Sequence, residues 1–147
     1  MGAMSVFLEK IESPHIHDIY QNVDTIWNQR REKFNQAMIE KDLPLRAANM
    51  SSVWSLYYTE PSRYNWMLQY YLRSEGLALS WVGTGRLIFS LNYSDAQFDE
   101  VLKRFVSACE SMKSAQWFWA PSDLTNKKIR RGILKEMFTS KKEQVSV

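Results

Sequence analysis

The chain alternates apolar and polar side chains most clearly between residues 76 and 94. An apolar run at 77–82 is followed by Gly83-Thr84-Gly85, and a second run occupies 86–93. Two such runs joined by a glycine-containing loop predict a β-hairpin. Every second residue of the later run is apolar, which predicts a strand with one buried face made of Leu87, Phe89, Leu91 and Tyr93.

Two longer segments repeat apolar residues at helical spacing. The stripe within 17–41 consists of Ile19, Val23, Ile26, Trp27, Phe34, Met38 and Ile39. Ser94 and Gln97 have the spacing of a capping box, which predicts a helix from Asp95 to about Ser114. Its stripe consists of Phe98, Val101, Leu102, Phe105, Val106, Cys109 and Met112. Both segments are therefore predicted to be amphipathic helices.

Shorter elements complete the predicted order. Strands are expected at 45–49 and 53–59, a helix at 64–74 with Gly76 in the left-handed position after it, and a last helix from a cap at Ser122 or Asp123 through Phe138. Residues from Thr139 onward are predicted to fray, and 6–11 is interpreted as the end of another element. This order predicts the α+β class, with a small, mostly antiparallel sheet packed by helices on one face. Because both faces of 53–59 are apolar, neighbouring subunits are expected to cover the second face.

Composition indicates one globular domain, since 147 residues with 45% apolar and 14% aromatic side chains can bury a core. The net charge of +3 is unevenly distributed, because 122–147 carries seven Lys/Arg and only three Asp/Glu. This basic segment also has apolar spacing, so we interpret it as a solvated helix face. Contact with phosphates or membranes is the alternative.

The single cysteine, Cys109, excludes an internal disulfide and is typical of a reducing compartment, so we expect a cytoplasmic location and a core position for this thiol. No run approaches the roughly 20 apolar residues that span a bilayer. The opening Met1-Gly2-Ala3-Met4 has the form of an expression scar, which indicates that the natural chain begins elsewhere.

Few motifs in the sequence indicate a catalytic, metal-binding or phosphate-binding site. His15 and His17 lack the neighbouring ligands of a zinc site, and no G-x-S-x-G turn is present. Gly83-Thr84-Gly85 lies in the predicted hairpin, outside the strand-to-helix context of a phosphate loop. Arg86 is the notable side chain, because a positioned guanidinium can grip a carboxylate through two parallel hydrogen bonds. The alternative is an exposed arginine at the end of a strand.

An RNA-binding sheet is a further alternative, because aromatic side chains beside a basic tail could stack on bases. The candidates are Trp54, Tyr58, Phe89 and Tyr93. No RNP-like run accompanies them, and Phe89 shares the predicted face of Leu87 and Leu91. Core packing therefore explains these aromatic residues more simply.

Four stretches carry a resemblance to a known family: 48–54 (ANMSSVW), 63–73 (RYNWMLQYYLR), 75–86 (EGLALSWVGTGR) and 89–93 (FSLNY). Residues 43–119 resemble the C-terminal small domain of class III (fold type I) pyridoxal-phosphate-dependent aminotransferases. The nearest branch is the glutamate-1-semialdehyde aminomutase-like domains of multidomain polyketide/peptide or prodiginine-type biosynthetic enzymes. The resemblance implies 1–4 as scar, 5–42 as a connecting helix region, 43–121 as the small-domain core and 122–147 as a basic C-terminal helix and tail.

The resemblance implies a transferase that moves an amino group to an aldehyde or ketone in secondary metabolite biosynthesis. In such enzymes a large-domain lysine binds the pyridoxal phosphate, and this chain offers no convincing replacement, since Lys41 and Lys103 are predicted to be exposed. Whether the chain is an enzyme is therefore left open. We expect an active parent, and a fragment that is inactive alone, binds no cofactor and carries no catalytic residue.

For the site, the resemblance aligns Arg86 with a substrate-carboxylate arginine and places Thr84 and Gly85 at the substrate mouth. The partners it implies are the large domain of the parent chain and a homodimer or self-associated form, without nucleic acid or membrane. Removing the large domain is expected to uncover apolar surface around Trp54, Trp81 and 117–119. The alternative functions are a stand-alone binding or scaffold domain of the same fold and, third, an RNA-binding α+β module.

Overall fold

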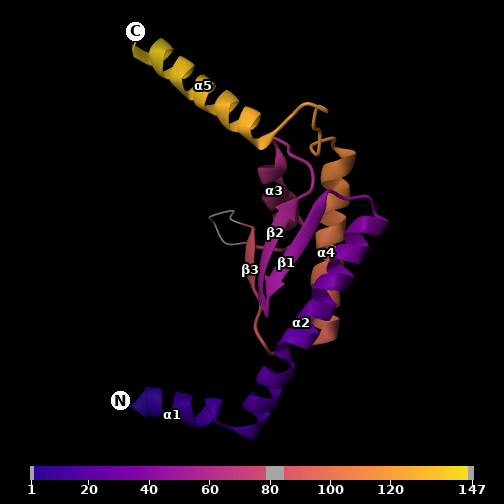
Figure 1. The fold of residues 1–147 in the computed structure, drawn as a ribbon, viewed down its shortest axis with the longest axis vertical. Helices are drawn as coiled ribbons and strands as arrows, with labels where there is room; N and C mark the ends of the chain where they lie inside the picture. Colours follow the sequence, from indigo (N-terminus) through magenta and orange to yellow (C-terminus); the bar gives the residue numbers. More distant parts are fainter. Residues whose placement is uncertain (1, 79–84, 146–147) are drawn as a thin grey trace.

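A computed structural model describes residues 2–78 and 85–145 of the chain (Figure 1). The elements are α1 (Gly2–Ile11), α2 (Pro14–Glu40), β1 (Leu45–Met50), β2 (Val53–Tyr58), the 3-10 helix η1 (Asn65–Met67), α3 (Leu68–Ser74), β3 (Arg86–Ile88), α4 (Asp95–Ser114) and α5 (Asn126–Val145). The predicted α+β class is confirmed, with a long N-terminal helix and a C-terminal helix.

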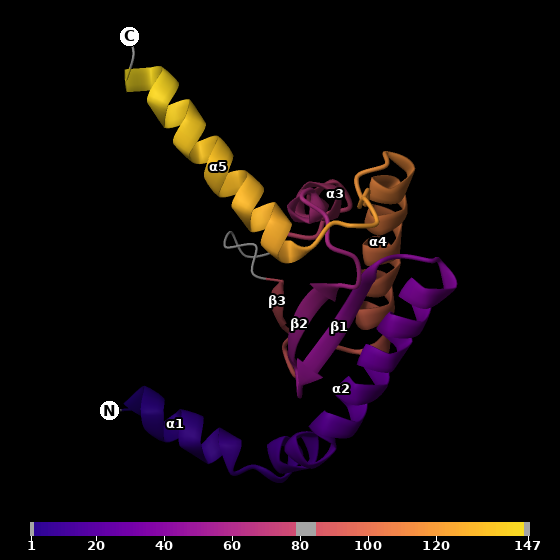
Figure 2. The ribbon, with the colours of Figure 1, turned by 45° about the horizontal axis from the view of Figure 1, so that its top comes forward.

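The three strands form one antiparallel sheet in the order β1-β2-β3. One face lies against the layer formed by α2 and α4, and it carries Leu45, Ala47, Trp54, Leu56, Tyr58 and Leu87 (Figures 1 and 2). The other face, called the outer face below, carries Arg46, Ala48, Met50, Val53, Ser55, Tyr57, Arg86 and Ile88. The strand expected at 53–59 is therefore present as β2, with Trp54, Leu56 and Tyr58 on the face toward the helices.

The predicted hairpin is confirmed only in part. The strand expected at 86–93 ends at Ile88, and β3 pairs with β2. Burial nevertheless alternates from Arg86 to Tyr93, because every second side chain packs against the core. Of the predicted partner run at 77–82, Leu77 and Ala78 are not in a strand, and 79–84 lie outside the described residues.

A cluster of aromatic rings fills the space between the sheet and the helices. Trp54 lies at its centre and is 1% exposed. Its ring centroid lies 5.7 Å from Phe34, 5.3 Å from Phe89 and 5.6 Å from Phe98. Edge-to-face contacts of this kind stabilise a core beyond the area they bury. The expectation that Trp54 contributes to an exposed surface is therefore wrong.

Arg30 is a charged residue inside this aromatic layer, 8% exposed. Its guanidinium lies 4.6 Å above the ring of Trp27 and donates hydrogen bonds to the carboxylate of Asp95 and, at 2.7 Å, to the carbonyl oxygen of Tyr93. These contacts join α2 to the start of α4. Of the predicted stripe on α2, Ile26 and Ile39 are exposed instead of buried.

Short sequence motifs determine where α3 ends and where α4 begins. The capping box is formed, since the Ser94 hydroxyl accepts from the Gln97 backbone and the Gln97 side chain accepts from the Ser94 backbone. Gly76 has φ +79° after α3, as predicted. The helix expected at 64–74 divides into the 3-10 turn η1 and α3.

The terminal helices α1 and α5 extend away from the layered body, on the side where β3 lies (Figures 1 and 2). The predicted cap of α5 at Ser122 or Asp123 is wrong, because the helix begins at Asn126 and the Thr125 hydroxyl accepts from the Lys128 backbone. The prediction of a frayed tail from Thr139 is also wrong, since α5 continues to Val145.

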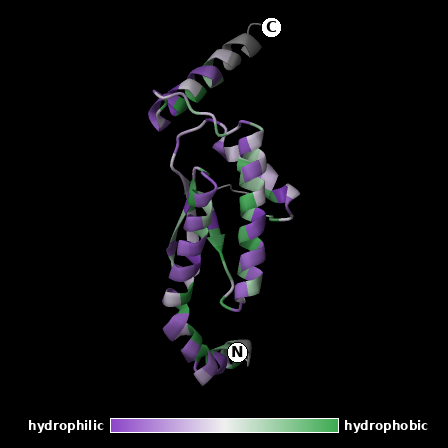
Figure 3. Ribbon diagram, turned by 90° about the vertical axis from the view of Figure 1, so that its right-hand side faces the viewer, coloured by the Kyte–Doolittle hydropathy of each residue, from purple (hydrophilic) through white to green (hydrophobic). Residues whose placement is uncertain are grey.

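Exposed apolar side chains lie on the terminal helices as well as on the layered body. Hydrophilic residues cover much of α2 (Figure 3). In contrast, α1 and α5 expose large apolar side chains, among them Met4, Val6, Phe7, Leu134, Met137 and Phe138. None of the described helices is both long and apolar enough to cross a membrane.

Candidate functional site

Arg86 lies at the first position of β3 and on the outer face of the sheet. Its Cα is paired with that of Ser55 in the middle of β2. The side chain is exposed, and its guanidinium forms no ion pair or hydrogen bond with another described residue. An arginine in this state keeps all five donors for a planar anion such as a carboxylate.

Gly85 extends the pairing of β3 with β2 by one residue. Its carbonyl oxygen accepts a hydrogen bond of 2.6 Å from the Leu56 backbone. Its φ is +67°, and a Cβ at this position would lie 2.8 Å from the Leu56 carbonyl oxygen. Strand pairing therefore requires glycine here, whatever role the residue has toward a substrate. Thr84, the third predicted site residue, lies outside the described residues.

The outer face carries two further polar side chains that the sequence analysis did not identify. Tyr57 is half exposed, and Arg46 is paired with it across β1 and β2. One terminal nitrogen of Arg46 donates to the carbonyl oxygens of Leu43 and Leu45, each at 2.7 Å. Both residues were missed from the sequence, because their position on the same face of the sheet as Arg86 depends on the strand register. The alternation within 45–49 places Arg46 on the face of Ala48 but does not identify the neighbouring strand.

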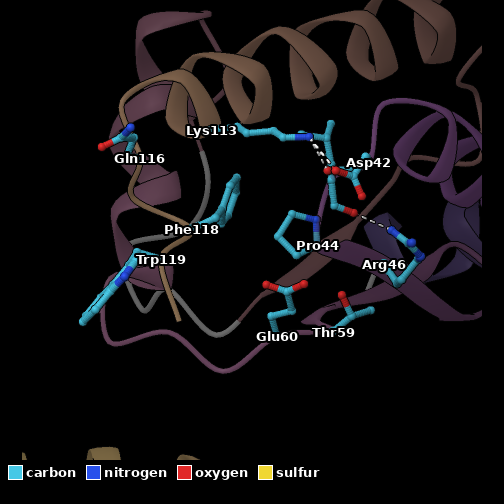
Figure 4. A pocket seen from close by; sticks show the side chains of 10 residues that line it. Asp42, Pro44, Arg46, Thr59, Glu60, Lys113, Gln116, Phe118 and Trp119 are labelled. Carbon is cyan, nitrogen blue, oxygen red and sulfur yellow. Dashed lines mark hydrogen bonds and ion pairs between the residues drawn. The ribbon is translucent and has the colours of Figure 1, made fainter. Parts of the chain in front are cut away.

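A second candidate is an open hollow of about 620 Å³ at the C-terminal ends of α2 and α4 (Figure 4). The residues that line it include Asp42, Pro44, Arg46, Glu60, Lys113 and Phe118. Its size is within the range of small-molecule sites. No local pattern in the sequence predicts this hollow, because its residues come from three separate segments, 42–46, 59–60 and 113–119.

The described lysines do not fit the covalent attachment of a pyridoxal cofactor. Lys33, Lys41 and Lys113 each form an ion pair with a carboxylate, and their side chains are between 43% and 56% exposed. Lys103 is exposed as well. A Schiff-base lysine must lose its proton, and exposure and pairing with a carboxylate both favour the charged form. We therefore derive no step of cofactor chemistry from this chain.

The single cysteine of the chain is part of the hydrophobic core. Cys109 is fully buried, as predicted, and burial raises the pKa of its thiol to about 12. A thiol with that pKa is a poor nucleophile at neutral pH. Across the described part of the chain, no group of three or more His, Cys, Asp or Glu residues could hold a metal ion.

The aromatic residues that an RNA-binding surface would need are turned toward the helices. Trp54 is buried, and Phe89 and Tyr93 pack against the core. The Tyr58 hydroxyl donates to the Asn65 carbonyl oxygen at 2.8 Å, and burial raises the pKa of this phenol. None of the four therefore offers a free ring for base stacking on the outer face.

The fold is that of a domain-sized part of pyridoxal-phosphate-dependent transaminases. A solved structure titled "Transaminase with PLP bound" matches with a TM-score of 0.57 and 15% identity, over 72% of this chain and 26% of that one. An omega-transaminase from Sphaerobacter thermophilus matches with a TM-score of 0.58 and 11% identity, over 71% of this chain and 26% of that one.

These identities show similarity of fold alone. The chain spans about a quarter of the length of the transaminases it resembles. No protein-family model and no curated protein sequence matches it.

Proposed function

We propose that this chain is the small C-terminal domain of a pyridoxal-phosphate-dependent aminotransferase and that it contributes to substrate recognition. The fold similarity to a domain-sized part of two transaminases supports the assignment. The observation that carries the recognition role is Arg86, whose guanidinium is exposed and has no partner among the described residues. The parent enzyme, in this proposal, is a class III aminotransferase of the glutamate-1-semialdehyde aminomutase type.

Arg86 would bind and orient the substrate through its carboxylate. A guanidinium matches a carboxylate with two parallel hydrogen bonds, which fix the direction of the substrate as well as its position. Gly85 fixes the start of β3 through its hydrogen bond to Leu56, so the guanidinium projects from a paired strand. A site on a paired strand orients a substrate more closely than a site on a loop.

The cofactor would belong to a large domain that precedes this one in the parent chain. We propose that this large domain packs against the outer face of the sheet. Met50 and Ile88 are each 78% exposed there, and Val53 lies between them in the register. Exposed apolar side chains in a row are typical of an interface, and in the isolated chain the same surface would favour self-association.

A stand-alone binding or scaffold domain of the same fold is the second candidate. The observation that favours it is the low identity of 11–15% to the matched transaminases, because one fold can host different functions. The two candidates differ in what the natural reading frame encodes, since only the first requires a pyridoxal-phosphate domain upstream.

The proposal is tested by an absorbance spectrum of the isolated chain and by deletion of this domain from the parent enzyme. The isolated chain mixed with pyridoxal phosphate should develop no stable absorbance band of a lysine Schiff base and no transaminase turnover. The complete parent enzyme should show both, and deleting this domain from it should abolish turnover. A stable Schiff-base band with turnover from the isolated chain would refute the proposal that the cofactor belongs to a separate large domain. A parent reading frame without an upstream cofactor domain would favour the scaffold.

A further inference from the structure

The hollow at the ends of α2 and α4 is separate from Arg86, and the inference drawn from it does not depend on the transaminase assignment. Two helix C-termini converge there, since α2 ends at Glu40 and α4 at Ser114. Asp42, just beyond α2, has φ +50°. The carbonyl groups of a final helical turn lack backbone partners and create a partial negative charge, so helix C-termini favour cations.

The cations that line the hollow already have partners. The Lys113 ammonium donates to the carbonyl oxygens of Lys41 and Asp42, at 3.2 and 2.7 Å, and to the Asp42 carboxylate at 2.9 Å. These three bonds use all the donors of an ammonium group. One terminal nitrogen of Arg46 is held by the carbonyl oxygens of Leu43 and Leu45.

Glu60 supplies the negative charge that remains. It lies in the turn after β2, and its backbone carbonyl accepts from the Asn65 side chain at 3.1 Å. Its carboxylate forms no ion pair or hydrogen bond with any other described residue. Figure 4 shows this carboxylate directed toward the ring of Pro44. Among the described residues that line the hollow, Lys113 is ion-paired with Asp42, Arg46 is hydrogen-bonded to carbonyl oxygens alone, and Glu60 carries a carboxylate without a partner.

Two apolar side chains line the hollow together with this carboxylate. Pro44 and Phe118 both line the hollow, and Phe118 is steadied by Tyr58, whose ring centroid lies 6.4 Å from its own. The buried Ser62 hydroxyl donates to the Trp119 carbonyl oxygen at 2.9 Å and so holds the backbone beside Phe118. An aromatic ring next to a carboxylate suits a cation that also carries an apolar group.

We propose that this hollow binds an organic ammonium ion, with the charged group paired to Glu60 and the apolar part against Pro44 and Phe118. A protonated primary amine with a ring or short chain has this chemistry. The Lys113 and Arg46 charges oppose a cationic ligand less than their number suggests, because Asp42 and backbone carbonyl oxygens already accept hydrogen bonds from them.

The test is an NMR titration of the full chain with benzylammonium chloride, and with benzyl alcohol as the uncharged equivalent. The ammonium should shift the backbone signals of Glu60 and Phe118 and the indole signal of Trp119, which also lines the hollow. Benzyl alcohol should bind at least threefold more weakly. Equal affinities for the two compounds, or shifts confined to other parts of the chain, would overturn the proposal.

Single substitutions test which residues bind the benzylammonium ion. Glu60→Gln should weaken benzylammonium binding at least threefold, and Phe118→Leu, which keeps an apolar side chain but removes the ring, at least twofold. Glu12→Gln removes an exposed carboxylate between α1 and α2 and should bind like the unchanged chain. A well-dispersed spectrum of each variant shows that it is folded. If folded Glu60→Gln retained full affinity, the carboxylate would have no role and the proposal would fail.

Discussion

Replacing Arg30 with methionine tests how the core tolerates its buried charge. The guanidinium stacks on Trp27, 4.6 Å from the ring, and donates to the Tyr93 carbonyl and the Asp95 carboxylate. Methionine keeps the apolar stem of the side chain and removes the charge and the donors. The variant therefore separates the polar contacts of Arg30 from the packing of its carbons.

The expected cost follows from three contacts of different strength. Leaving the Tyr93 carbonyl without its donor costs about 1 kcal/mol, and loss of the cation–π contact costs about 1 kcal/mol more. The ion pair adds less than about 1 kcal/mol, because the Asp95 side chain is 88% exposed and its charge is screened by water. We expect Arg30→Met to lower the free energy of unfolding by about 2–3 kcal/mol.

Urea unfolding measures this change. With a denaturant slope of about 1–3 kcal/mol/M for a domain of this size, the midpoint should fall by about 0.7–3 M. Lys33→Met is the matched control, since the Lys33–Asp99 pair is about half exposed on both sides and its loss should cost less than about 1 kcal/mol. An Arg30→Met variant as stable as the unchanged chain would refute this account of Arg30.

Two further predictions concern single residues of the fold. Gly85→Ala should destabilise the chain by about 2 kcal/mol or more in thermal unfolding, because φ is +67° and the new Cβ would lie 2.8 Å from the Leu56 carbonyl oxygen. Gly132→Ala in α5, where nothing lies within 4 Å of the added Cβ, should be neutral or stabilising by up to about 1 kcal/mol, and equal effects at the two glycines would contradict the strand pairing. Cys109 should react with a disulfide reagent only as the chain unfolds, since burial raises its thiol pKa to about 12 and little thiolate forms below that pH. Rapid labelling at pH 7 in the folded chain would show that the thiol is accessible.

Elements with local signals could be predicted from the sequence. The capping box at Ser94 and the stripe behind it determine α4 within its own twenty residues, and both agree with the structure. The alternation at 86–93 likewise predicted which side chains face the core, although the strand itself ends at Ile88.

Features that depend on distant segments could not be predicted. The partner of β3 is β2, and no local pattern specifies that pairing or its register. Arg30 was missed because a charged side chain in a helix is interpreted as solvent-facing, whereas its buried position depends on acceptors more than sixty residues away. The cap of α5 was misplaced because Ser122, Asp123 and Thr125 are all good capping residues within four positions.

The candidate site shows the same limit. Arg86 and Gly85 were proposed from the sequence, while the position of Arg46 and Tyr57 on the same face depends on the register of the sheet. The similarity to transaminases is one of fold, at 11–15% identity.

The most direct measurement is the kcat/KM of the complete parent enzyme carrying Arg86→Lys, for a substrate with a carboxylate and for an analogue without one. Arg130→Lys, an exposed change on α5, is the control. We predict a loss of about tenfold or more for the carboxylate substrate alone, because lysine cannot form the two parallel hydrogen bonds of a guanidinium. An equal effect on both substrates, or none on either, would contradict substrate recognition by this domain.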